Sequence, residues 1–387
     1  MISKISVIGA GIMGSGIAQV AAFHQCEVNI IDSLPQALES SKAKLQSVLN
    51  SLVEKEKLNQ EKFQSILANI NWTSEIKEIS SSNLVIEAVF ENMEIKQKLF
   101  SQMESVVSDE CILATNTSSL SIAEIASSCT NPSHVLGIHF FNPVPLMKLV
   151  ELIPAVETDI GILDGVKSIL ESWGKTVVTA KDTPGFIVNR VARPFYGEAL
   201  KIYEEGTADF STIDWAMKKL GGFRMGPFEL MDYIGNDVNY NATKSVYIGS
   251  NKNSRYKPSP IQKRMVKEGL LGRKSGRGYY DYSEGALIPY AEKNEELGRQ
   301  IFNRILVMLI NEAADALNLS IASRDDIDTA MTTGVNYPKG LLKWADLIGI
   351  NLVFNQLEEL YTHYGDDRYK PSPLLKKMAE ENSKFYA

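Results

Sequence analysis

Residues 4–14 read KISVIGAGIMG: a short β-branched run ends in glycines at positions 9, 11 and 14, and the helical stretch SGIAQVAAF follows at 15–23. A glycine at position 9 permits a tight turn. Gly11 lets the backbone approach a pyrophosphate, and Gly14 lets the helix pack closely on the strand. This stretch predicts a strand, turn and helix that bind a dinucleotide, and with it a parallel α/β sheet.

The residues that follow the turn support the same interpretation. Ile12 and Met13 begin the helix, where free backbone N–H groups and the positive end of the helix dipole can face phosphates. Asp32 follows the next β-branched run, EVNII at 27–31. An acid at this place accepts hydrogen bonds from the ribose hydroxyls and repels a 2′-phosphate. NAD is therefore predicted as the cofactor rather than NADP.

Up to about residue 185, short β-branched runs alternate with longer helical stretches. Strands alternating with helices predict a mostly parallel sheet with helices on both faces, a Rossmann-like domain. The stretch 36–69, rich in Lys, Glu, Gln and Leu, predicts a helical pair attached to this sheet. The expected strands are 4–8, 27–31, 84–89, 111–115, 135–140, 149–153 and 176–179.

After residue 185 helix formers dominate and the chain repeats itself. RYKPSP occurs at 255–260 and again at 368–373, and Asn189-Arg190 recurs as Asn303-Arg304. Ordered matches of this kind over about 100 residues indicate a duplicated helical domain. We therefore predict a first domain at 1–185, helical copies at 186–282 and 300–387, and a polar linker at 283–299.

The composition limits the possible partners. The 387 residues carry a net charge of −7, so no general attraction to nucleic acid or to an anionic membrane is expected. The three cysteines lack metal-binding or disulfide spacing, and no metal site is predicted. No apolar run reaches the ~18 residues of a membrane span. The chain opens directly on a strand, so no signal peptide and a cytoplasmic location are expected.

Among only four histidines, His139 is the best candidate for a catalytic base, because it ends an apolar strand where ligands of open α/β sheets bind. Glu151 follows in LVELIP, from where a returning strand could place its carboxylate on the imidazole. Ser118, at the end of another strand, could hold a substrate oxygen, and Asn142 lies on the turn after the histidine. The structural alternatives are a core histidine, a solvated glutamate and a serine that caps a helix.

Longer stretches resemble the 3-hydroxyacyl-CoA dehydrogenase family, which includes 3-hydroxybutyryl-CoA dehydrogenases. HFFNPVP and DTPGFIVNR are the most restrictive of them. The resemblance implies a Rossmann-like NAD domain followed by two all-α domains of the 6-phosphogluconate-dehydrogenase C-terminal type. The matching stretches, in family order, are 9–22, 85–100, 114–122, 137–153, 181–190, 225–237 and 272–282.

The resemblance also implies roles for single residues. His139 resembles the family's base and Glu151 its paired carboxylate, while Ser118 and Asn189 resemble residues that contact the substrate. Positions implied near the nicotinamide half of NAD are Glu91, Lys96, Asn142 and Lys274, and positions implied near CoA are Ser51, Lys55 and Lys57. For Lys55 and Lys57 a solvated helix face is the alternative.

The extra helical copy departs from the single-copy pattern. We expect the two copies to pack on each other inside one chain, which permits either a monomer or a homodimer. Position 274 of the GRKSGRGYY segment has no sequence counterpart in the second copy, which predicts a structural copy in which Asn303 is a relic of Asn189.

The resemblance and the candidate residues together predict NAD-dependent oxidation of a short-chain (S)-3-hydroxyacyl-CoA, such as 3-hydroxybutyryl-CoA, in fatty acid metabolism. Oxidation of 3-hydroxyadipyl-CoA in aromatic degradation is an alternative. A β-hydroxyacid dehydrogenase is a rival class, but the Lys it needs four residues before the Asn is Gly185 here. A non-catalytic NAD-binding protein is a further alternative, since a fold does not dictate a function.

Overall fold

The computed structural model describes residues 2–386, which form two compact units, one up to Asp182 and one from Thr183 onward. This boundary lies slightly before the predicted one at 185. The Asp182 carboxylate accepts hydrogen bonds from Ser121 Oγ (2.9 Å) and Ala123 N (2.8 Å), which ties this residue to the first unit.

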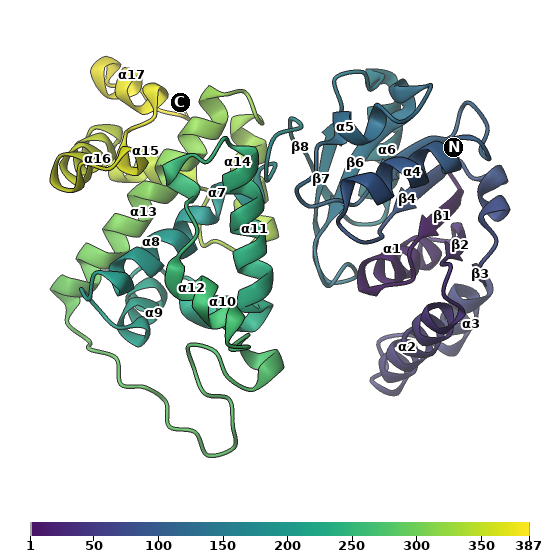
Figure 1. The fold of residues 1–387 in the computed structure, drawn as a ribbon, viewed down its shortest axis with the longest axis horizontal. Helices are drawn as coiled ribbons and strands as arrows, with labels where there is room; N and C mark the ends of the chain where they lie inside the picture. Colours follow the sequence, from purple (N-terminus) through teal and green to yellow (C-terminus); the bar gives the residue numbers. More distant parts are fainter. Residues whose placement is uncertain (1, 387) are drawn as a thin grey trace. The chain divides into compact units, whose positions relative to one another are not determined.

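The first unit is built on one eight-stranded sheet in the order β3-β2-β1-β4-β5-β6-β7-β8 (Figure 1). All neighbouring strands are parallel except β6 and β7. The strands are β1 (Lys4–Ile8), β2 (Glu27–Ile31), β3 (Ile70–Thr73), β4 (Leu84–Glu87), β5 (Ile112–Thr115), β6 (Val135–Phe140), β7 (Leu149–Pro154) and β8 (Thr176–Thr179).

From β1 the chain moves outward to β2 and β3, then crosses back and continues through β4, β5 and β6 on the other side. Such crossovers are right-handed, so the helices of the two halves cover opposite faces. This confirms the predicted fold class. The helices are α1 (Ile12–Phe23), α2 (Pro35–Glu54), α3 (Gln60–Ala68), α4 (Met93–Glu104), α5 (Ile122–Ala126) and α6 (Ile160–Ser172).

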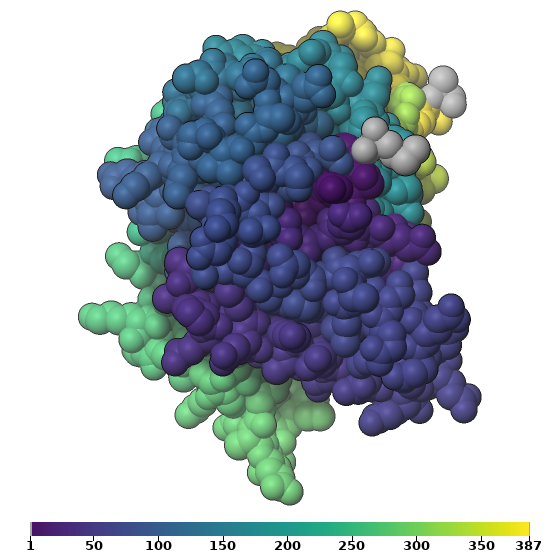
Figure 2. Space-filling model, turned by 90° about the vertical axis from the view of Figure 1, so that its right-hand side faces the viewer, coloured from purple at the N-terminus to yellow at the C-terminus, as the bar shows by residue number. Residues whose placement is uncertain are grey.

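Two features of this unit go beyond the sequence prediction. Strand β3, with the sequence INWT, was not predicted because Asn71 and the short length hide the β pattern. The predicted helical pair at 36–69 is present as α2 and α3. The two helices lie at the surface of the unit, and β3 follows α3 in the chain (Figure 2).

The second unit is entirely helical (Figure 1) and contains both repeats. Gly235 (φ 101°) joins α10 to α11 and Gly349 (φ 102°) joins α15 to α16, so the copies agree in backbone detail. The first copy has α7 (Val188–Val191), α8 (Arg193–Glu204), α9 (Phe210–Lys219), α10 (Pro227–Ile234), α11 (Asn236–Gly249) and α12 (Pro260–Lys267). The second has α13 (Glu295–Asn318), α14 (Arg324–Thr329), α15 (Leu341–Ile348), α16 (Ile350–Tyr364) and α17 (Pro373–Glu381).

The first helix differs between the copies. Pro194 separates α7 from α8, since proline lacks the N–H needed in a helix interior. Met308 takes its place in the second copy, and α13 is continuous over 24 residues. Asn294 caps α13 by accepting from Glu296 N and Leu297 N, so this helix begins inside the segment 283–299 that was predicted as a linker.

The end of the second copy corrects one prediction. The loop with Lys274 indeed has no counterpart, but the two aromatic residues after it do. Tyr279 N and Tyr280 N donate to Asp232, and Phe385 N and Tyr386 N donate in the same way to Asp346. The second copy therefore closes with the same contact after a shorter connection.

Within residues 2–386, no helix combines the length and apolar character that a bilayer span requires.

Candidate functional site

The glycine turn after β1 has the close backbone packing that the motif predicts. Gly9 has a φ of 109°, and a Cβ there would lie 2.7 Å from Ala88 O. At Gly14 a Cβ would lie 1.9 Å from Gly9 O. At Gly11 no atom lies within 4 Å of an added Cβ, so the backbone is open to a ligand.

The start of α1 completes this cradle. Gly11 is the N-cap, and the first N–H groups of the helix, at Ile12 and Met13, precede its first internal hydrogen bonds. Ile12 is 72% exposed. These donors and the open space at Gly11 fit a pyrophosphate, and the contact itself stays a prediction.

Asp32 has a structural contact that the sequence did not reveal. Its Oδ2 accepts from Ala10 N (2.8 Å) and its Oδ1 from Leu34 N (3.0 Å). The carboxylate therefore holds the glycine turn against the end of β2. Each oxygen has a second lone pair that can accept a ribose hydroxyl.

The carboxyl ends of the central strands meet at one edge of the sheet. In the strand register Ile8, Glu87, Thr115 and Gly137 lie side by side on β1, β4, β5 and β6. His139 stands two residues farther along β6, beyond that edge. The order of the strands reverses between β1 and β4, and this switch point is where open α/β sheets bind ligands.

His139 and Glu151 form a buried pair across β6 and β7. His139 Nδ1 lies 2.6 Å from Glu151 Oε2, and the two residues are directly opposed in the antiparallel register. Glu151 is fully buried and His139 is 6% exposed. The ring of Phe141 packs beside the imidazole, with centroids 4.5 Å apart. A buried carboxylate on Nδ1 sets the tautomer and stabilises the imidazolium.

Glu91 follows β4 and holds the loop that carries Ser118. Its Oε1 accepts from Thr117 Oγ1 (2.6 Å), Ser118 N (3.0 Å) and Ser119 Oγ (3.2 Å). Burial opposes ionisation, but Lys96 and these donors lower the pKa of Glu91 below its ordinary value. Glu91 thus positions Ser118.

Lys96 lies in a buried cluster of charges beside Glu91, and its place near the nicotinamide stays a prediction. Its side chain is 1% exposed, and Nζ lies 2.6 Å from Glu87 Oε1 and 3.5 Å from Glu91 Oε2. Glu87, which also accepts from Thr115 Oγ1 (2.7 Å), was not singled out from the sequence. The sequence signal that could have identified Glu87 is its place as a single acid in the apolar run LVIEAV. In this geometry Lys96 positions Glu91.

Asn142 lies on the exposed loop after β6. Lys175, also not predicted, donates from Nζ to Val144 O (2.5 Å) and Met147 O (2.8 Å) of that loop. Burial lowers the pKa of Lys175. The Lys175 side chain thereby anchors the loop next to His139.

The CoA candidates gather at one end of α2. Ser51 lies in its last turn, Lys55 is its C-cap and Lys57 lies in the connection to α3. Both lysines are exposed, and Lys55 N donates to Ser51 O (3.2 Å). Their CoA contacts stay predictions.

The remaining candidates belong to the second unit. Asn189 lies in the short helix α7. Lys274 lies in the loop after α12, where its Nζ pairs with Asp237 Oδ1 at 2.5 Å. The roles of both residues toward substrate and nicotinamide stay predictions.

Comparison with known proteins agrees with this geometry. Residues 4–183 match the family model "3-hydroxyacyl-CoA dehydrogenase, NAD binding domain". Residues 185–282 and 301–384 both match "3-hydroxyacyl-CoA dehydrogenase, C-terminal domain", one stretch in each repeat.

Similar proteins include single-copy and double-copy chains. The 3-hydroxyadipyl-CoA dehydrogenase of Escherichia coli K12 is 35% identical over 98% of both chains. A probable 3-hydroxybutyryl-CoA dehydrogenase of Bacillus subtilis is 41% identical over 73% of this chain and 98% of its own. The crystal structure of a 3-hydroxybutyryl-CoA dehydrogenase from Escherichia coli K12 has a TM-score of 0.94, at 35% identity and 99% coverage of both chains.

These matches favour the predicted enzyme class over a β-hydroxyacid dehydrogenase or a non-catalytic protein. The glycine turn and Asp32 fit a dinucleotide, and the buried imidazole–carboxylate pair fits a general base. The chain belongs to the 3-hydroxyacyl-CoA dehydrogenase family and is an NAD-dependent oxidoreductase.

Proposed function

We propose that the chain oxidises short-chain (S)-3-hydroxyacyl-CoA, with 3-hydroxybutyryl-CoA as the substrate, to the 3-ketoacyl-CoA. The observation that carries this proposal is the buried pair of His139 and Glu151 beyond the carboxyl edge of the sheet. The pair supplies a base whose protonated form is stabilised.

His139 removes the proton of the 3-hydroxyl group. With Nδ1 held by Glu151, the proton passes to Nε2, and the carboxylate stabilises the resulting imidazolium. NAD⁺ supplies the acceptor for the hydride that leaves C3. In the reverse direction the imidazolium donates its proton to the 3-keto oxygen. Positioned acid–base groups contribute about 10²–10⁴ in rate.

Other residues orient the substrate. Ser118, held by Glu91, hydrogen-bonds an oxygen near C3, and Asn189 contacts the hydroxyl or thioester region. Ser51, Lys55 and Lys57 at the end of α2 bind polar groups of CoA. The phosphates of CoA carry negative charge, and the two exposed lysines supply positive charge for them.

A dicarboxylic substrate is a second candidate. One relative that covers both helical copies carries the name 3-hydroxyadipyl-CoA dehydrogenase, although a solved structure with the same coverage carries a 3-hydroxybutyryl name. Adipyl recognition requires a cation for the distal carboxylate.

Steady-state kinetics on purified protein separate these candidates. The substrates are 3-hydroxyacyl-CoA esters from C4 to C10 and 3-hydroxyadipyl-CoA. The highest kcat/KM at C4 supports the proposal. A higher kcat/KM for the adipyl ester than for both the C4 and the C6 monocarboxylic esters supports the second candidate and rejects 3-hydroxybutyryl-CoA. No NADH formation with any ester rejects both.

A further inference from the structure

The contact between the two helical copies contains two matching clusters of charged side chains. Glu312 of the second copy is fully buried. Its ion-pair partners among the described residues, Arg190 and Arg255, both belong to the first copy. Arg190 Nε lies 2.7 Å from its Oε1, Arg255 Nη1 lies 3.1 Å from its Oε2, and the Tyr256 hydroxyl donates to Oε1. Asp315 joins this cluster through both arginines.

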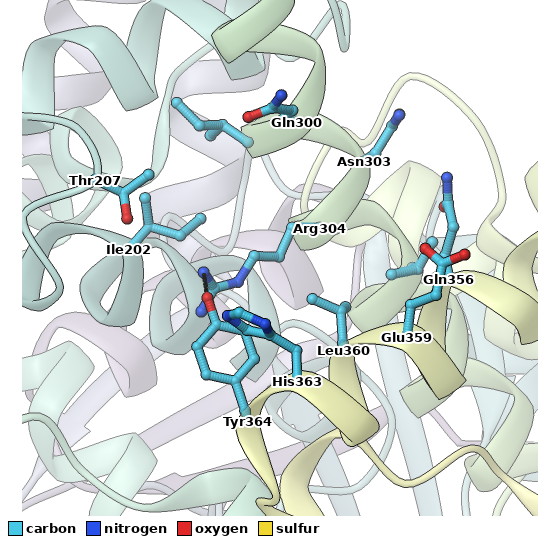
Figure 3. Close-up of a pocket in the computed structure, with 12 residues that line it drawn as sticks. Ile202, Thr207, Gln300, Asn303, Arg304, Gln356, Glu359, Leu360, His363 and Tyr364 are labelled. Carbon is cyan, nitrogen blue, oxygen red and sulfur yellow. Dashed lines mark hydrogen bonds between the residues drawn. The ribbon is translucent and has the colours of Figure 1, made fainter.

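The corresponding cluster surrounds Glu198 of the first copy, which is also fully buried. Arg304 Nε lies 2.6 Å from Oε1, Arg368 Nη2 lies 3.2 Å from Oε2, and the Tyr369 hydroxyl donates to Oε1 at 2.7 Å. Arg304 also binds Glu205 and Tyr364, beside a cavity of about 570 Å³ that Asn303 helps to line (Figure 3). Each glutamate is thus held by two arginines and a tyrosine of the other copy.

The two clusters differ in what lies next to them. Arg190 directly follows Asn189 on α7, which has only four residues and is too short to be a stable helix in isolation. Arg304 follows Asn303 on α13, whose 24 residues form a continuous helix. Helix α7 contacts α13 and the π-helical turn η5 (Ala330–Gly334) of the second copy, in addition to α11 of its own. The second copy therefore packs directly against the segment that carries Asn189.

We propose that Glu312 is a positioning residue for the dehydrogenase reaction: through Arg190 it holds α7 in the register that places Asn189 for the substrate. The second copy then contributes to catalysis without a reacting group of its own. This proposal rests on the substrate role of Asn189 given under Proposed function.

The test compares Glu312→Gln with Glu198→Gln in the full-length enzyme. Both changes remove one buried negative charge from the same kind of cluster, so both should lower the Tm by a similar amount. Only Glu312→Gln should reduce kcat/KM for the acyl-CoA substrate, by about tenfold to a hundredfold, since small misplacements of a positioning group have effects of that size. The Kd for NADH should stay unchanged in both variants, as measured by fluorescence titration.

A double-mutant cycle separates positioning from general damage. Asn189→Ala alone should lower kcat/KM. Adding Glu312→Gln to Asn189→Ala should lower kcat/KM by less than about a further twofold, because the effects of coupled residues are not additive. Full additivity, or equal losses of kcat/KM in Glu312→Gln and Glu198→Gln, would overturn the proposal. Wild-type kcat/KM in Asn189→Ala would instead reject the role of Asn189 itself.

A milder pair serves if Glu312→Gln does not fold. Asp315→Asn and Glu205→Gln change the partly exposed acids that accompany the two clusters, with side chains 16% and 20% exposed. Asp315→Asn should lower kcat/KM and Glu205→Gln should not. Equal kcat/KM in the two variants contradicts the proposal.

Discussion

His139 Nδ1 and Glu151 Oε2 lie 2.6 Å apart because the two residues face each other across the only antiparallel pair in the described sheet. The carboxylate of Glu151 is completely buried and His139 is 6% exposed. A buried carboxylate without a partner is costly, so the pair stabilises itself only when the ring can share or accept a proton. The tautomer and the orientation of the His139 ring are therefore set by the same contact.

Replacing the base should stop catalysis and spare cofactor binding. His139→Gln is expected to lower kcat by about 10²–10⁴ while the Kd for NADH changes little. His134→Gln, in the short 3-10 helix η2 (Pro132–His134) that precedes β6, is the matched control and should keep wild-type kcat. Stopped-flow or steady-state absorbance at the NADH band measures the rate. Near-wild-type turnover of His139→Gln would remove His139 from the mechanism.

Replacing the carboxylate should act through the ring. Glu151→Gln keeps the size of the side chain but loses the charge that stabilises the imidazolium, so kcat should fall by about 10²-fold. The double variant with His139→Gln should be no slower than His139→Gln alone. Glu157→Gln, exposed after β7, is the control. Two independent, multiplying losses would show that Glu151 does not act on His139.

The acid at the end of β2 should matter for the cofactor more than for the acyl substrate. Asp32→Ala removes the ribose acceptor and the contact to Ala10 N, so the Kd for NADH should rise by about 10- to 100-fold, as expected for bonds to a charged group. Isothermal titration with NADH and, separately, with acetoacetyl-CoA measures both affinities. An unchanged Kd for NADH would reject the ribose role.

The buried ion pair of Lys96 and Glu87 should stabilise the folded protein. Lys96→Met leaves Glu87 buried without a cation, which typically costs about 3–5 kcal/mol in the free energy of unfolding. The double variant Glu87→Gln/Lys96→Met should recover much of this loss. Lys98→Met, exposed on the same helix, is the control in urea denaturation. A loss for Lys96→Met no larger than that of the control would contradict this account.

The loop that carries Ser118 should depend on pH through Glu91. The folded-state pKa of Glu91 lies below its ordinary value of 4.5, so its ionised form stabilises the native state above that pH. This contribution is lost as the pH falls through the folded-state pKa. Unfolding free energies of wild type and Glu91→Gln should therefore differ most above pH 4.5 and converge below it.

Glu94→Gln, at an exposed position in the first turn of α4, controls for the loss of one surface charge. A difference between wild type and Glu91→Gln that grows on acidification would reverse the sign and reject the assignment.

Much of the site could be predicted from local pattern. The glycine turn, Asp32 and His139 each stand at the end of a β-branched run, and parallel strands bring such ends to one edge. The duplication was also visible, because collinear matches such as RYKPSP need no structure to be seen. Strand β3 and the start of α13 at Glu295 were missed because a short strand and a capped polar segment carry weak periodicity.

The sequence by itself determined the fold class and the cofactor and predicted His139 as the base, since these depend on residue types at short spacings along the chain. Only the tertiary structure decided which side chains contact and hold the site residues. Lys96 pairs with Glu87 and Glu91, Lys175 donates to the loop after β6, and Glu312 pairs with Arg190. Those contacts join residues far apart in the chain. Their partners are chosen by strand register and helix packing, which no local pattern encodes.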